Sequence, residues 1–173
     1  MDRLEGPLKK RLKDLLPKEG SFNGSSIRQK IRVSGARYLL VHTFSHLIMR
    51  ELEFTCGYPT ASLKERLYIA PDMAGVLIYT AEGSEGSMGG LIWQTDPEKM
   101  ELLLKSALER AEDCSSDPLC WESEGQGLFN LNLAACFSCA LVAETACEER
   151  NLALDRQVLI HPTIGYFNRK QTL

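Results

Sequence analysis

Five of the six cysteines in this 173-residue chain lie between Cys114 and Cys147, and their spacing suits metal binding. Cys136 and Cys139 are separated by two residues, which lets two thiolates approach one ion from a single turn. A tetrahedral zinc site needs a second pair of sulfurs from another segment. Cys147 with either Cys120 or Cys114 supplies that pair, so five cysteines compete for four positions.

The end of a predicted helix bears on the choice of the fourth ligand. Asp96 and Pro97 form a typical helix start, and the apolar residues that follow keep a helical spacing to about Asp113. The end of this helix presents carbonyl groups, which do not stabilise a thiolate at Cys114. We therefore expect zinc to be held by four cysteines, with Cys114 as the alternate fourth ligand: Cys120, Cys136, Cys139 and Cys147.

The same cysteines admit other chemistry. A redox-active Cys-x2-Cys pair normally opens a helix in a βαβ unit, and Phe137 and Ser138 are unusual residues between such thiols. Disulfides belong to oxidising compartments. Charged residues follow Met1 directly and no apolar run reaches about 20 residues, so we expect a cytoplasmic protein without a membrane segment. That location favours a metal over disulfides, while a thiol redox switch or free buried thiols stay open as alternatives.

The charges of the chain are unevenly distributed. Residues 1–37 carry ten basic and four acidic side chains, whereas residues 38–173 carry ten basic and nineteen acidic ones. We therefore divide the chain into a basic N-terminal arm or helix, residues 1–35, and a body, residues 36–173. The arm either contacts a nucleic-acid backbone or is a solvated face covering the body, and the lack of aromatic residues for base stacking favours the second interpretation.

Hydrophobic spacing predicts the main elements. Leucines from Leu4 to Leu16 indicate a short amphipathic helix, and residues 27–33 suggest an exposed strand or an arm. Residues 36–55 are long, apolar on most sides and rich in helix formers, which is typical of a helix at the centre of a fold. Residues 67–69 and 75–80 are rich in β-branched and aromatic residues and predict two short buried strands.

Gly57 and Pro59 mark the end of the long helix, because glycine suits a C-terminal cap and proline cannot continue a helix. Residues 61–66 predict a single helical turn before the first strand. The glycine-rich residues 82–90 lack the lysine of a phosphate-binding loop, so we expect a tight turn there. The predicted fold class is α/β (α+β), with a small sheet packed on a long central helix and a four-cysteine zinc-binding loop.

His42 and His46 lie four residues apart on the long helix, the spacing of a metal-binding pair. A zinc-protease motif needs glutamate directly after the first histidine, and Thr43 stands there instead. A buried, hydrogen-bonded pair is therefore the preferred interpretation. The enzymatic alternative is a metal-dependent hydrolase that uses His42, His46 and an acidic residue such as Glu51.

Several motifs in the same order resemble a known family. LLVHTFSHLIMRELEFTCGYPTASLKERLYI, GVLIYTAEGSEGSMGGLI, CSSDPLC and ACFSCALVAETACEERNLALDR, within about residues 36–160, are similar to the C-terminal region of DrmB-type proteins. These are components of the bacterial DISARM anti-phage defence system. The motifs also resemble, more distantly, the zinc-binding domain (MZB) attached to MrfA-type DNA-repair helicases.

The resemblance implies a non-catalytic module, residues 36–173, that works beside a superfamily 2 helicase partner on DNA. DNA contact would come through the complex or through the basic arm, and any ATPase activity from the partner. It also implies that Cys136, Cys139 and Cys147 hold Zn²⁺. The helicase-attached relatives space their metal cysteines more compactly than the fifteen residues between Cys120 and Cys136 here, and DrmB-type proteins are much longer than this chain.

Overall fold

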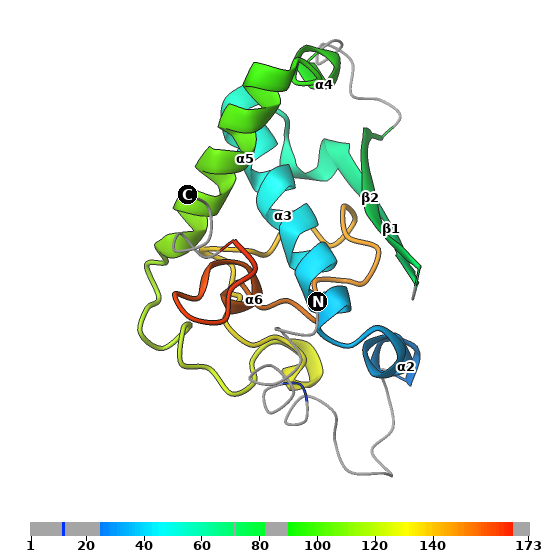
Figure 1. Cartoon of the computed structure of the whole chain (residues 1–173), viewed down its shortest axis with the longest axis vertical. Coiled ribbons are helices and arrows are strands. Elements are labelled where there is room, and N and C mark those ends of the chain that lie inside the picture. The colour runs from blue at the N-terminus through cyan, green and yellow to red at the C-terminus, as the bar shows by residue number, and fades with distance from the viewer. Residues whose placement is uncertain (1–11, 13–24, 71, 82–89, 168–173) are drawn as a thin grey trace.

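A long helix, α3 (Ala36–Cys56), forms the axis of the molecule (Figure 1). The computed structural model describes Leu12 and residues 25–70, 72–81 and 90–167. Thirteen of the 21 residues of α3 are buried, which confirms the predicted central helix. It ends at Gly57, whose left-handed backbone (φ 71°, ψ 22°) lets its N–H bond to the carbonyl of Glu53.

The second long helix, α5 (Pro97–Glu112), lies along α3 (Figure 1). Its start is as predicted, because the Asp96 carboxylate accepts hydrogen bonds from the N–H groups of Glu98 and Lys99. Leu103, Ala107 and Ala111 are buried at spacings of four residues and face the core. A short helix, α4 (Gly90–Trp93), precedes α5. No helix in the described ranges combines the length and apolarity needed to cross a membrane.

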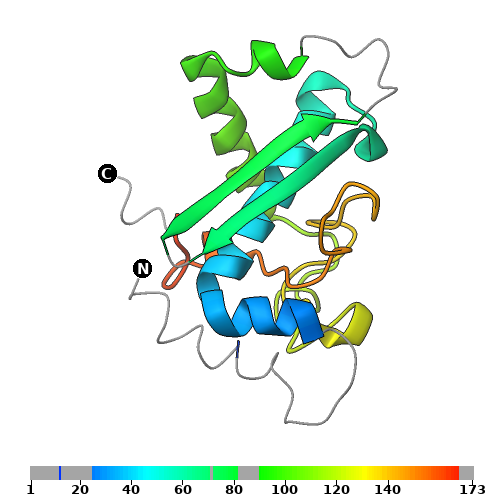
Figure 2. The ribbon, with the colours of Figure 1, turned by 90° about the vertical axis from the view of Figure 1, so that its right-hand side faces the viewer.

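An antiparallel hairpin packs on another side of α3 (Figure 2). Strand β1 (Leu63–Ala70) pairs with β2 (Met73–Thr80), with Leu63 opposite Thr80 and Ala70 opposite Met73. Both predicted strands lie inside these limits, and the small sheet on a long helix is confirmed. The helical turn predicted over residues 61–66 is wrong beyond Ser62, because the 3-10 turn η1 (Thr60–Ser62) gives way directly to β1.

Burial of the hairpin differs from the prediction of two buried strands. Leu63 and Glu65 of β1 are buried and point the same way, since alternate residues of a strand share a face. No residue of β2 is fully buried, because only one face of this two-stranded sheet is covered.

The strand or arm expected over residues 27–33 is wrong: this segment belongs to helix α2 (Ser25–Ser34). The four-residue spacing of Ile27 and Ile31 places both on one helical face, where both are buried in the main core, while Val33 stays exposed. Apart from the buried Leu12, the helix predicted from Leu4 to Leu16 lies outside the described residues, as do residues 82–89 of the glycine-rich stretch.

Residues 113–156 have little regular structure and run from yellow-green through yellow to orange in Figure 1. They contain the 3-10 turn η2 (Leu128–Asn130) and lead into α6 (Gln157–Ile160). Asparagine side chains here bond backbone groups that would be paired with other backbone groups in a helix or sheet. Asn151 bonds both backbone groups of Val142 (3.0 and 2.9 Å), and Asn132 accepts from Leu154 N–H at 3.0 Å. The segment is therefore fixed by specific contacts in place of repetitive structure.

Gly57→Ala should lower the free energy of unfolding by about 1 kcal/mol, because a side chain disfavours the left-handed conformation that ends α3. Gly75→Ala is the matched control: a Cβ has open space at both positions, but only Gly57 has a positive φ. Denaturant unfolding of the metal-loaded protein measures both changes. Equal losses for the two variants would contradict this account of the helix end.

Candidate metal centre

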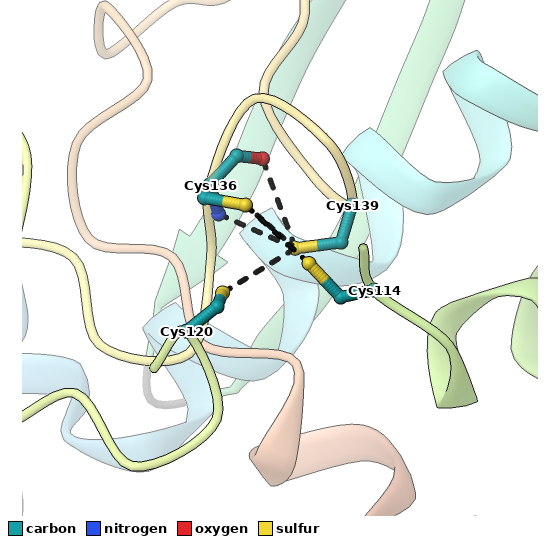
Figure 3. A group of neighbouring side chains, drawn as sticks. All are labelled: Cys114, Cys120, Cys136 and Cys139. Carbon is teal, nitrogen blue, oxygen red and sulfur yellow. Dashed lines mark hydrogen bonds between the residues drawn. The ribbon is translucent and has the colours of Figure 1, made fainter. Parts of the chain in front are cut away.

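Four cysteine side chains meet at the base of α5 (Figure 3). Cys114 follows the helix, Cys120 lies in the next loop, and Cys136 and Cys139 belong to one tight turn. The sulfurs are 3.5 Å apart for Cys114 and Cys136, and 3.8 Å apart for both Cys120–Cys139 and Cys136–Cys139. Zinc–sulfur bonds of about 2.3 Å in a tetrahedron require sulfurs about 3.8 Å apart, so these distances fit one zinc ion.

Polar hydrogens point at three of these sulfurs. The N–H of Ser116 lies 3.4 Å from Cys114 Sγ, and the N–H of Cys136 lies 3.3 Å from Cys139 Sγ. The Gln126 amide donates to Cys120 Sγ at 3.6 Å. Such donors stabilise negative charge on sulfur, as thiolate ligands require.

The helix-end argument against Cys114 overlooked how the chain leaves α5. The helix ends at Glu112, and Asp113 has an extended backbone (φ −108°, ψ 132°) that separates the helix from the cysteine. The sulfur then accepts a hydrogen bond from Ser116 N–H in the loop. Cys114 therefore has a donor that stabilises its thiolate despite its position after a helix C-terminus.

The thiols of the cluster differ in acidity. Burial raises the pKa of Cys120 to about 11 and the pKa of Cys139 beyond its ordinary range. At Cys136, burial also raises the pKa, but hydrogen bonds with Cys114 and Ser116 outweigh it and lower the pKa to about 6. Protons would thus remain on part of the cluster at neutral pH, and a divalent cation is what favours four thiolates together.

Arg156 provides a buried positive charge next to this cluster. Its guanidinium donates to the carbonyls of Ala111 (2.9 Å) and Glu112 (3.3 Å), and it pairs with Asp117. Burial alone would lower the pKa of Arg156. Hydrogen bonding to Asp117 and the nearby charges of Cys139 and Cys120 outweigh this effect, so the pKa of Arg156 is raised. Four thiolates around Zn²⁺ would carry a net charge of −2, which this guanidinium would partly offset.

The structure divides the predicted ligands between two places. Cys120, Cys136 and Cys139 lie together, and Cys114, the alternate, completes their group. Cys147 lies in a second, separate group with three buried residues: His42, His46 and Glu65.

The acidic residue chosen for the hydrolase alternative does not join the histidines. Glu51 pairs with Arg110 at 2.8 Å and accepts a hydrogen bond from Thr55 at 3.0 Å. Glu65 lies beside the histidines instead, and sequence reasoning missed it. The sequence feature that could have identified Glu65 is its position two residues after Leu63. In a strand, these two side chains share a face, so the carboxylate lies on the apolar face.

Four clustered sulfurs on short loops after α5, in a fold with a long central helix and a hairpin, define a small metal-binding domain of the zinc class. A family model described as the MrfA Zn-binding domain matches residues 44–140, more than half of the chain, and the chain belongs to this family. The matched range contains all four clustered cysteines and excludes Cys147.

A protein of Bacillus paralicheniformis, described as DISARM protein DrmB, is 44% identical over 124 residues. The match covers 71% of this chain and 22% of that protein, so the chain spans about a fifth of its relative's length. Both resemblances noted in the sequence, to the MrfA-type domain and to DrmB-type proteins, are therefore confirmed.

Arg156→Met should destabilise the protein by about 3 kcal/mol, because it strips a buried charge from Asp117 and leaves the carbonyls at the end of α5 without their donor. Lys105→Met is the control, since it removes an exposed ion pair with Glu101 and should leave stability unchanged. Chemical denaturation of the metal-loaded variants tests this difference, and similar curves for the two would refute it.

Proposed function

We propose that this chain is a non-catalytic zinc-binding module that acts with a superfamily 2 helicase partner on DNA, in anti-phage defence of the DISARM type. Its zinc ligands are Cys114, Cys120, Cys136 and Cys139. The observation that carries the proposal is that three sulfur–sulfur distances are 3.5 to 3.8 Å and that all four sulfurs lie within 4.8 Å of one another, which suits four ligands of one zinc ion. Four thiolates fill the coordination shell and leave no position for an activated water, which favours a scaffold over an enzyme.

When bound, zinc supplies a cross-link between the loop after α5 and the turn at residues 136–139. The chain's own groups connect this turn to the central helix. Arg50 of α3 donates to the carbonyls of Phe137 (3.3 Å), Ser138 (3.1 Å) and Leu141 (2.8 Å). Because these loops lack a sheet or long helix of their own, local folding and metal binding should be coupled.

The helicase and DNA parts of the proposal rest on likeness and charge. The matching family carries the name of MrfA, and the Bacillus relative is a DISARM protein by name. Residues 1–37 carry a net charge of +6, so they suit contact with a nucleic-acid backbone. We propose that DNA is reached through the complex, with this basic segment as a contributor.

Cys139→Ser and Cys136→Ser should each lose one equivalent of zinc and much of the soluble yield, because three sulfurs cannot close the site. Cys56→Ser is the control, since Cys56 belongs to neither cluster. Elemental analysis of purified protein gives the metal content. Normal folding of Cys139→Ser with undiminished zinc would overturn the ligand assignment.

A tagged chain expressed in its native host should capture a helicase, identified by mass spectrometry, and retain it after nuclease treatment. Cys56→Ser should capture the same helicase, and Cys139→Ser should not. Loss of the helicase on nuclease treatment would show that only DNA bridges the two proteins. Absence of any helicase from the untreated sample would contradict the partnership.

A further inference from the structure

A second group of side chains converges inside the molecule, apart from the four cysteines. His42 and His46 come from α3, Glu65 from β1, and Cys147 from the irregular segment. The Nε2 atoms of His42 and His46 lie 3.2 and 3.5 Å from Glu65 Oε1, and each lies 3.3 Å from Cys147 Sγ. One potential ligand atom from each of the four residues thus lies within 4.8 Å of the other three.

These distances fit the edges of a tetrahedron around one ion. Typical zinc bond lengths to nitrogen, oxygen and sulfur place nitrogen about 3.3 Å from oxygen and about 3.6 Å from sulfur. Each histidine nitrogen is at nearly such a distance from both the carboxylate and the sulfur. A plain hydrogen bond needs only one close acceptor, whereas a shared metal requires all four atoms to surround one point.

The hydrogen-bond partner of His46 determines which of its ring nitrogens carries the proton. Its Nδ1 lies 2.9 Å from the carbonyl of Ala140. Because a carbonyl only accepts hydrogen bonds, the proton of a neutral imidazole is on Nδ1, and Nε2 has a lone pair. That lone pair faces the Glu65 carboxylate, so two acceptors face each other inside the protein. A cation between them removes the conflict, and a backbone carbonyl on the far nitrogen is the usual support of a metal-bound histidine.

The two anionic residues are held by donors from outside the group. Ser45 donates to Glu65 Oε2 at 2.5 Å, and the N–H of Glu148 donates to its Oε1 at 3.2 Å. Cys147 Sγ accepts from two backbone N–H groups, those of Glu149 (3.3 Å) and Asn151 (3.1 Å). One carboxylate, one thiolate and two neutral imidazoles balance the charge of Zn²⁺, as a buried site requires.

We propose that His42, His46, Glu65 and Cys147 form a second zinc site, which joins α3, β1 and the irregular segment. Four protein ligands close the site. All four residues are at least nine-tenths buried, so the ion is structural. The family match of residues 44–140 omits His42 and Cys147, and the inference does not depend on the helicase partnership or on the first site.

Elemental analysis and zinc-edge X-ray absorption on the unsubstituted protein provide the direct test. We expect two zinc ions per chain. Together the two ions should have five sulfur ligands and three nitrogen or oxygen ligands. One zinc with a shell of four sulfurs would show a hydrogen-bonded group without metal, and would overturn this inference while leaving the proposed function standing.

Variants then assign the second ion. Glu65→Gln and Cys147→Ser should each bind one zinc fewer and keep the intense cobalt–thiolate absorption of the four-cysteine site after Co²⁺ substitution. The matched controls are Glu51→Gln, because Glu51 is as buried as Glu65, and Cys56→Ser; both should keep two ions. If a variant does not fold, the metal content and the zinc-edge X-ray absorption of the unsubstituted protein still decide whether the second site binds zinc. Two ions retained in soluble Cys147→Ser would refute the site.

Discussion

The structure depends on buried polar side chains of α3 that need partners from elsewhere in the chain. His42, Thr43, Ser45 and His46 are fully buried in the middle of this helix. A buried polar group without a hydrogen bond costs several kcal/mol. Ser45 finds its partner on β1, His46 contacts Ala140, and Thr43 accepts a hydrogen bond from Asp155 N–H at 2.9 Å. These requirements fix where the hairpin and the irregular segment lie against the helix.

Backbone conformation shows that the irregular segment does not hold its shape by local preference. Five of its residues other than glycine have positive φ angles: Phe129, Asn130, Arg150, Asn151 and Ala153. This region is unfavourable for most side chains and is tolerated best by asparagine. Ala153, which has no such tolerance, is fully buried. Contacts made across the fold, including those of Asn132 and Asn151, must therefore offset the local strain.

Elements with strong local signals were predictable from the sequence, whereas the partners of buried polar groups were not. Asp96 and Gly57 mark helix ends through chemistry confined to a few residues, and both assignments are confirmed. The cluster of cysteines was visible from spacing, but the ligand choice depended on how the chain turns after Asp113. Grouping Cys147 with His46 requires knowing which face of α3 meets which loop, and spacing carries no such information.

The position of Ala140 in the chain connects the two groups of potential metal ligands. Its neighbour Cys139 belongs to the four-sulfur group, and its own carbonyl orients His46 of the second group. If both proposed centres hold zinc, occupation of either would steady a backbone position that the other needs. By thermodynamic linkage, ions at the two centres would strengthen each other's affinity by the same factor, and the chain would load both over a narrow range of metal concentration.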